Sequence, residues 1–281
     1  MKKPDLNNFT QRALTGIIFV AVLLGAIVLS EYASAILFFF IILLGTREFY
    51  NFFKDGECSP QKNVGIISSL SYFTISVFIN QSQLANTTLF LLVPIVFSIF
   101  IIELFRNKPN PISNISYTLL GIVYIAFPMT LLYELSFIEN NQFGGAYNYQ
   151  IVLGFFFLLW ANDTGAYLVG RKLGRTKLFE RISPKKTWEG SLGGAVLGIG
   201  VGYLNAQIFT DLSLFNWIIV ALLVVVFGSL GDLVESLFKR SLNIKDSGKL
   251  LPGHGGLLDR FDGIFIAAPI VYTYLRFIFA F

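Results

Sequence analysis

Charged side chains are scarce in this chain, since only 14% of its 281 residues are Asp, Glu, Lys or Arg. A soluble domain carries about a quarter charged residues, so an ordinary soluble globule is excluded. Hydrophobic residues make up 54% of the sequence, and the mean hydropathy is +0.67. In lipid, only helices and closed barrels satisfy the polar groups of the backbone. The composition therefore predicts an all-α, polytopic integral membrane protein.

Cysteine and histidine each occur once, as Cys58 and His254. A single cysteine excludes an internal disulfide, and one residue of each type cannot build a Cys/His metal cluster. Walker phosphate loops and dinucleotide-binding fingerprints are also missing. No linker, low-complexity tract or solenoid repeat divides the sequence. We therefore expect 1–281 to form one polytopic membrane domain.

Long apolar segments, by contrast, fill the sequence, and nine of them are predicted to span the membrane. If the N-terminus is placed inside, every Lys and Arg except Arg276 falls on that same side. Cytoplasmic loops are enriched in these residues, so we predict a cytoplasmic N-terminus and an extracytoplasmic C-terminus. The excess of Lys and Arg over Asp and Glu is then explained without a nucleic-acid partner. The predicted spans are 13–30, 33–46, 64–79, 86–103, 116–136, 151–170, 191–209, 214–236 and 263–281.

The first span has an alternative interpretation. It begins with basic residues, and the Ala33-Ser34-Ala35 that follows it matches a signal-peptidase site. Because the apolar run is long enough to cross a membrane, a retained span is favoured over a cleaved one.

The loop 171–190 carries seven basic residues and two acidic ones. One interpretation is the positive-inside rule with attraction to anionic lipid, worth about 1 kcal/mol per basic residue. The other is a polyphosphate site. Lys185 and Lys186 follow Ser183 and precede Thr187, which gathers cations and hydroxyl donors at a predicted turn.

Just before this loop, Asn162 and Asp163 lie inside an apolar segment. Asp163 is about 12 residues, or about 18 Å, from its outer end. A carboxylate at that depth costs several kcal/mol unless it is paired or hydrated. Asp163 therefore either pairs with a basic residue for structural reasons or lines a site, and the second interpretation is favoured.

A row of glycines marks the next span, with Gly190, Gly194, Gly198 and Gly202 spaced four residues apart. This spacing makes a smooth ridge along one face of a helix, which allows a second helix to approach closely. We interpret the ridge as structural.

The eighth span ends in acids and bases. Asp232 and Glu235 share a helix face, and Lys239 follows four residues after Glu235. An ion-paired helix end explains Glu235, Lys239 and Arg240. It does not explain Asp232, which lies one turn deeper. The small Gly231 beside it predicts room for an ion or a phosphate.

The segment 245–262, KDSGKLLPGHGGLLDRFD, is polar although an apolar span follows it. Its glycines allow the backbone to approach a ligand, and consecutive N–H groups in such turns bind anions. Helix-end electrostatics, about 0.3–1 kcal/mol each, is one explanation for Asp259 and Asp262. Mg²⁺ usually takes one or two carboxylates plus substrate phosphates. Asp232 and Asp259 flank one short loop and are therefore predicted as metal ligands.

The stretch Ser236–Asp262, SLFKRSLNIKDSGKLLPGHGGLLDRFD, resembles the signature of the phosphatidate cytidylyltransferases, or CDP-diacylglycerol synthases. The upstream motifs NDTGAY and SPKKTWEG resemble the family too, so the likeness covers about 155–281. The N-terminal spans, about 1–150, are similar only in hydropathy. We expect them to serve as a scaffold for a catalytic part, about 151–281.

The resemblance implies that CMP passes from CTP to phosphatidate, which gives CDP-diacylglycerol and pyrophosphate. It also implies Mg²⁺ on Asp232 and Asp259, a second cation such as K⁺, a homodimer, and a bacterial inner membrane with the site facing the cytoplasm. Residues expected to act on the reacting groups are Asp163, Lys185, Lys186, Lys239, Arg240, His254 and Arg260. Residues expected to bind substrate are Asn162, Ser183, Thr187, Lys245, Asp246, Gly255, Gly256 and Asp262.

Two other functions stay open. A CTP-dependent polyprenol or phytol kinase would attack the γ-phosphorus with a lipid alcohol, and the complete signature argues against it. An ion-coupled transporter would place acids near the middle of the membrane in repeat-related spans. Here the basic loops and most acids gather on one face of the C-terminal half, which argues against a transporter.

Overall fold

A computed structural model of the protein describes residues 6–53, 58–138, 146–248 and 255–279. The chain divides into two compact units. The first unit comprises Met1–Tyr133 and Ile244–Phe261, and the second comprises Glu134–Asn243 and Asp262–Phe281. The segment 244–261 therefore packs with the N-terminal spans. That the units act as one membrane domain stays a prediction.

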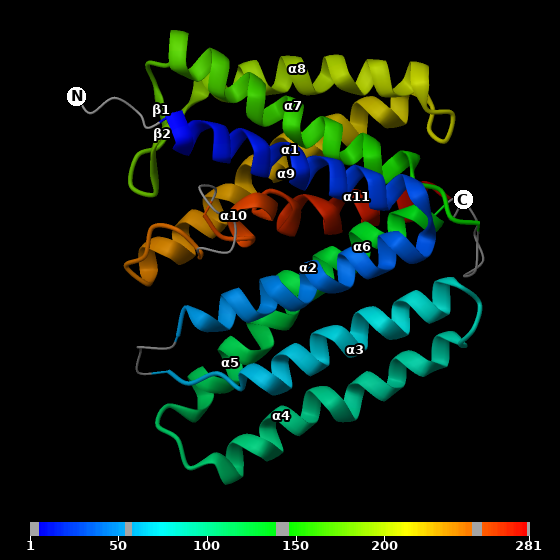
Figure 1. Ribbon diagram of the computed structural model, residues 1–281, viewed down its shortest axis with the longest axis vertical. Coiled ribbons are helices and arrows are strands. Elements are labelled where there is room, and N and C mark those ends of the chain that lie inside the picture. Colours follow the sequence, from blue (N-terminus) through cyan, green and yellow to red (C-terminus); the bar gives the residue numbers. More distant parts are fainter. Residues whose placement is uncertain (1–5, 54–57, 139–145, 249–254, 280–281) are drawn as a thin grey trace. The chain divides into compact units, whose positions relative to one another are not determined.

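The first unit is built from antiparallel helices joined by short turns. Within it α2 packs against α1 and α3, and α3 packs against α4 (Figure 1). Ser30 begins α2, because its side chain accepts the Ala33 N–H at 3.1 Å and caps the helix. The elements are α1 (Leu6–Leu29), α2 (Glu31–Asn51), α3 (Lys62–Asn80), the 3₁₀ helix η1 (Asn86–Leu91), α4 (Leu92–Arg106), α5 (Pro111–Gly121), the π-helical η2 (Ile122–Ala126), α6 (Phe127–Glu134), which ends at the unit boundary, and the short α10 (Leu258–Phe261).

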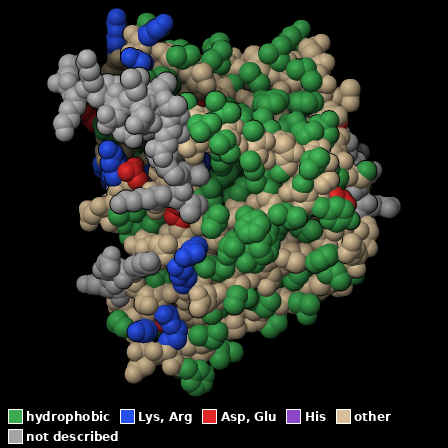
Figure 2. Space-filling view, in the orientation of Figure 1, with side chains coloured by type: hydrophobic (Ala, Val, Ile, Leu, Met, Phe, Trp, Pro, Cys, Tyr) green, Lys and Arg blue, Asp and Glu red, His purple; other side chains and the backbone are tan. Residues whose placement is uncertain are grey.

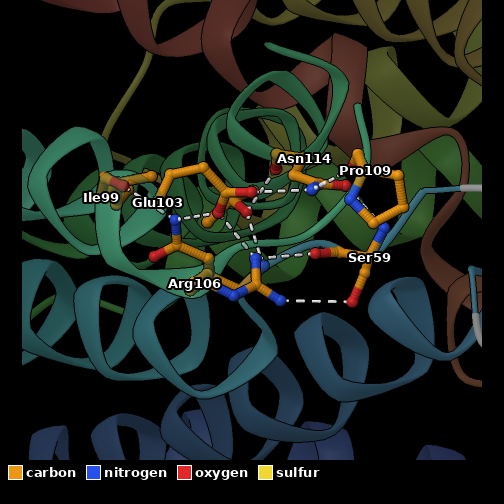
Figure 3. A network of polar contacts seen from close by, with 8 residues as sticks. Ser59, Ile99, Glu103, Arg106, Pro109 and Asn114 are labelled. Carbon is orange, nitrogen blue, oxygen red and sulfur yellow. Dashed lines mark hydrogen bonds and ion pairs between the residues drawn. The ribbon is translucent and has the colours of Figure 1, made fainter. Parts of the chain in front are cut away.

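A buried polar network joins α4 and α5 to the residues just before α3 in the first unit (Figure 3). Glu103, only 5% exposed, accepts hydrogen bonds at 2.7 Å from Gln61, Asn114 and Arg106. Arg106 also donates to the carbonyl oxygen of Ser59 at 2.8 Å. A buried carboxylate is tolerated when it is paired and fully hydrogen-bonded, and these contacts meet that condition.

The second unit contains three long helices that lie side by side. Here α8 packs against α7 and α9, and α9 packs against α11 (Figure 1). Thr187 caps α8 by accepting the Gly190 N–H at 3.2 Å, and Ser213 caps α9 in the same way. The elements are η3 (Leu135–Phe137), α7 (Gln150–Leu173), β1 (Lys177–Phe179), β2 (Ser183–Thr187), α8 (Trp188–Ile208), α9 (Leu214–Ser241) and α11 (Ile264–Phe279).

The glycine ridge on α8 performs the predicted packing role. A Cβ atom on Gly194 would lie 2.5 Å from the Asn162 Oδ1 of α7. On the same ridge, a Cβ on Gly202 would lie 2.9 Å from Ala221 of α9. Since real side chains do not approach so closely, the glycines are what allow α8 to lie against both neighbours.

The prediction of an all-α polytopic membrane protein is confirmed. In the described part of the chain, seven helices are long and apolar enough to cross a membrane, and Ala13–Leu29 is a shorter apolar helix. Each predicted span falls on a helical segment, but α8 is not among the seven, so the count of nine stays a prediction, as does the orientation. Hydrophobic side chains cover much of the face in Figure 2. On α4, Leu104 and Phe105 are both 78% exposed, as expected of a lipid-facing helix.

The turn predicted around Ser183–Thr187 is wrong, because these residues form β2 of a small antiparallel hairpin. In its register, Lys177 lies opposite Thr187 and Phe179 lies opposite Ser183. The sequence does not reveal this hairpin, because β1 has only three residues and β2 is Ser-Pro-Lys-Lys-Thr. Hydrophobic alternation, the usual signal for a strand, is therefore missing.

Candidate active site

A polar cavity of about 440 Å³ lies in the second unit, between α7, β2, the start of α8 and α9. Six residues predicted for the site line it, which are Asn162, Asp163, Lys185, Lys186, Thr187 and Asp232. They come from three separate stretches of sequence, so folding brings the NDTGAY motif, the SPKKTWEG motif and the eighth span together. Asp163 and Lys185 are exposed on the cavity wall.

An ion pair crosses this cavity. The Lys186 ammonium lies 2.6 Å from Asp232 Oδ2 and donates to the Ser229 carbonyl oxygen at 3.3 Å. Ser236 donates to Asp232 Oδ1 at 3.2 Å. Both charges are partly exposed, so solvent weakens the attraction between them. A cation and a carboxylate are therefore held next to each other at the surface of a polar cavity.

Asn162 lines the cavity from a buried position. Its side chain is 1% exposed, and its Nδ2 donates to Ser229 Oγ at 3.3 Å. Among the described residues, its Oδ1 has no hydrogen-bond partner, although Gly194 leaves space for it. A buried acceptor without a partner in the protein can accept a hydrogen bond from water or from a ligand.

The basic hairpin is tied to α8 by Glu189, which precedes the predicted span 191–209. Its carboxylate accepts the backbone N–H groups of Arg175 and Thr176 at 3.1 Å. These hydrogen bonds, with that from Arg175 the strongest influence, lower the pKa of Glu189 to about 2. A negative charge thus anchors the hairpin that carries Lys185 and Lys186.

Gly231 has a different role from the one predicted. A Cβ on Gly231 would lie 2.6 Å from the Asp262 carbonyl oxygen and 3.0 Å from Gly263. The interpretation that Gly231 leaves room for an ion or a phosphate is therefore wrong, since backbone already fills that space. This close packing places the Asp262 backbone against α9, next to Asp232.

The predicted ion pair at the end of α9 is present. Lys239 lies 2.7 Å from Glu235, whose side chain is buried. Arg240 is exposed in the last turn of the same helix. These contacts match the helix-end interpretation, and roles for Lys239 and Arg240 toward a substrate stay predictions.

In the first unit, Asp259 accepts hydrogen bonds from backbone N–H groups of the polar segment to which it belongs, 245–262. Asp259 Oδ2 accepts the N–H groups of Gly256 at 2.9 Å and Ser247 at 3.1 Å. Gly255 has a φ of 83°, which a glycine adopts without strain. One predicted anion-binding N–H, that of Gly256, is thus used within the protein.

Four further site predictions in this segment, for Lys245, Asp246, His254 and Arg260, stay predictions. Lys245, Asp246 and Arg260 are exposed. His254 lies outside the described residues. Ser183, in the second unit, begins β2 and does not belong to the described lining of the cavity.

The metal prediction also stays a prediction. Asp232 belongs to the second unit and Asp259 to the first. Within the residues that the structure describes, no three His, Cys, Asp or Glu side chains gather as metal ligands. The cavity does hold two carboxylates, Asp163 and Asp232. Their oxygen atoms, facing a polar cavity, are the ligands that Mg²⁺ prefers.

Sequence reasoning missed Ser229, which contacts both Asn162 and Lys186. The spacing could have identified it, because Ser229 lies three residues before Asp232 and so shares its helix face. It also missed Tyr167 and Arg171, which line the cavity and are hydrogen-bonded to each other at 3.2 Å.

A helical membrane protein whose polar cavity gathers lysines and carboxylates is suited to a phosphorylated substrate. The chain matches the cytidylyltransferase family over residues 10–278, and it belongs to that family. It is 32% identical over 268 residues to a phosphatidate cytidylyltransferase from Staphylococcus saprophyticus, covering 92% of this chain and 96% of that one. A phosphatidate cytidylyltransferase from Staphylococcus epidermidis is equally similar. One from Staphylococcus aureus is 40% identical over 158 residues, covering 56% of this chain and 57% of that one.

Proposed function

We propose that the protein is a phosphatidate cytidylyltransferase, which transfers CMP from CTP to phosphatidate and releases pyrophosphate. The observation that carries the proposal is the similarity to phosphatidate cytidylyltransferases over 92% of the chain. The cavity supports it, because two lysines, two aspartates and a buried amide face one space.

In the proposed reaction, a phosphate oxygen of phosphatidate attacks the α-phosphorus of CTP. A new phosphorus–oxygen bond forms while the bond to the β-phosphate breaks, and pyrophosphate leaves. Because the attacking phosphate is already ionised, no general base is needed. The task of the protein is to bring two anions together, through charge neutralisation and alignment.

The lysines of the hairpin suit this task. Lys185 and Lys186 would hold phosphates, since a lysine ammonium acts as a point charge for them. Asn162 would donate or accept a hydrogen bond at the buried side of the cavity. Arg171, at the exposed rim, adds a further positive charge.

A divalent cation fits the donor set of this cavity. As the sequence predicts, Mg²⁺ would be held by Asp232 and Asp259. Asp163 lines the same cavity as Asp232. When bound, it would supply further neutralisation of the CTP phosphates. A second cation such as K⁺ and a homodimer are parts of the same proposal, and they rest on the family resemblance.

The protein is an integral membrane protein, and its relatives are bacterial. We place it in a bacterial cytoplasmic membrane with the cavity facing the cytoplasm. The basic residues of 171–190 favour that side. CTP is a soluble cytoplasmic nucleotide, whereas the phosphate of phosphatidate lies at the membrane surface, so both would reach a cavity there.

The proposal is tested by assaying the purified protein in vesicles that contain phosphatidate, with CTP and Mg²⁺ in solution. We expect pyrophosphate and CDP-diacylglycerol to form in equal amounts, and neither to form without phosphatidate. Formation of CDP together with a phosphorylated lipid alcohol, when an alcohol such as a polyprenol is added, would indicate a kinase instead.

A further inference from the structure

Glu48 is a buried carboxylate in the N-terminal part of the chain, near the end of α2. Its side chain is 7% exposed although it follows a long apolar run. Among the described residues, no Lys or Arg forms an ion pair with it. Because an unpaired buried charge is costly, the hydrogen bonds that Glu48 makes must compensate for its burial.

Among the described residues, the hydrogen-bond donors to Glu48 all come from the segment 244–261. The Leu257 N–H donates to its Oε2 at 2.9 Å, and the Leu258 N–H donates to its Oε1 at 3.1 Å. The Ser247 hydroxyl donates to the same Oε1 in a short hydrogen bond. Charge-assisted hydrogen bonds of this kind are stronger than neutral ones, so Glu48 fixes the segment at three points.

Two glycines of the signature-like stretch make room for this carboxylate. A Cβ on Gly248 would lie 2.8 Å from Glu48 Oε2. A Cβ on Gly256 would overlap Glu48 Oε1 and Ser247 Oγ. Glycine at these positions is therefore explained by Glu48, in addition to any approach of a ligand.

Ser247 connects Glu48 to Asp259. Its Oγ donates to Glu48 and accepts the Asp259 N–H at 3.3 Å. Its own N–H donates to the Asp259 carboxylate at 3.1 Å. The backbone and the carboxylate of Asp259 are thus both held by a residue that Glu48 orients.

We infer that Glu48 is a positioning residue for the catalytic signature. Glu48 acts through Ser247 and so sets the orientation of the Asp259 carboxylate. This inference rests on the proposed function, in which Asp259 takes part in holding Mg²⁺. It gives the N-terminal spans a direct part in the site, and the match to the family, which begins at residue 10, includes these spans.

The test compares Glu48→Gln with Glu103→Gln, a matched control. Glu103 is another buried acid of the first unit, and its hydrogen bonds go to Gln61, Arg106 and Asn114. In detergent, without substrate, we expect at least tenfold faster hydrogen exchange in peptides covering 255–261 for Glu48→Gln. For Glu103→Gln, exchange in those peptides should change less than twofold.

Enzyme kinetics supply the second readout. The half-saturating Mg²⁺ concentration of Glu48→Gln should rise at least fivefold, and Glu48→Asp should recover part of the loss. A merely structural contact would lower the amount of folded protein without changing this concentration. If Glu48→Gln does not fold, Ser247→Ala serves instead, since it breaks the link and keeps the carboxylate.

Unchanged exchange in 255–261, or an unchanged Mg²⁺ dependence in a folded variant, would overturn the inference. Failure of the proposed function is distinguishable, because it would show as absence of cytidylyl transfer by the unaltered protein. The exchange experiment needs no turnover and still decides whether Glu48 holds the segment.

Discussion

Lys186 projects from β2 into the cavity, and its ammonium lies 2.6 Å from Asp232. In the proposed reaction this cation would turn toward the phosphates of CTP. Replacing Lys186 by Met should therefore lower kcat/KM about 100-fold, or about 2.7 kcal/mol of transition-state stabilisation. Steady-state kinetics at saturating phosphatidate would measure the change.

Lys172 provides the control for this substitution. It is an exposed basic residue in the last turn of α7, and it does not belong to the described lining of the cavity. Lys172→Met should change kcat/KM less than twofold. Similar losses at both positions would favour the other interpretation of 171–190, a positive surface that only attracts anionic lipid.

Asp232 and Asp259 are expected to act as one metal-binding unit. Each change to Asn should remove nearly all activity, and the double change should be hardly worse, because residues that act together are strongly non-additive. Glu235→Gln is the comparison, since Glu235 is accounted for by its ion pair with Lys239. Losses at Asp232 and Asp259 that multiply independently would assign the two acids to helix-end electrostatics instead.

At the level of whole elements, the packing of α8 depends on which face each glycine occupies. Gly194 lies against Asn162, whereas no atom lies within 4 Å of a Cβ placed on Gly200. Gly200→Ala should thus be neutral or raise stability by up to about 1 kcal/mol, through helix propensity. Gly194→Ala should lower it by about 1–3 kcal/mol, through overpacking.

Thermal unfolding in detergent measures both glycine variants. We expect a lower melting temperature for Gly194→Ala and an equal or higher one for Gly200→Ala. Equal effects of the two substitutions would mean that α8 does not pack through its glycine ridge.

The helices were predictable from the sequence because their signals are local. Apolar runs located the long helices of the described chain, and spacing by four residues identified the Glu235–Lys239 pair and the glycine ridge. The ion pair between Lys186 and Asp232 was not predictable, since these residues are distant in sequence and only the tertiary fold brings them together. The hairpin was missed for a related reason, because its short strands have no hydrophobic alternation.

Site residues with a signal that is local in the sequence could also be predicted. Asp163 and Asp232 stood out as acids within apolar segments, and both line the cavity. Glu48 lies just beyond the predicted span 33–46, where an acid is ordinary. Its role was not predictable, because its hydrogen-bond donors lie about 200 positions further along the chain.

At the scale of the whole molecule, we predict how the chain is oriented in the membrane. If every basic residue except Arg276 is cytoplasmic, a reporter fused after Phe281 should be active only outside the cytoplasm. Paired reporters, one active in the periplasm and one in the cytoplasm, would measure this. A cytoplasmic signal at the C-terminus would mean that the chain crosses the membrane an even number of times.

The division of the signature between two units also bears on the whole molecule. The described residues of 244–261 belong to the first unit, and α11 packs against α9 in the second unit. The signature-like stretch therefore contributes residues to both units.

The fate of label from CTP tests the central claim most directly. The purified protein is incubated with phosphatidate, Mg²⁺ and CTP labelled either at the α-phosphate or at the γ-phosphate, and the lipid is then extracted. A phosphatidate cytidylyltransferase transfers the α-label to lipid and leaves the γ-label in pyrophosphate. Transfer of the γ-label to lipid, or of neither label by a folded protein, would contradict the proposed function.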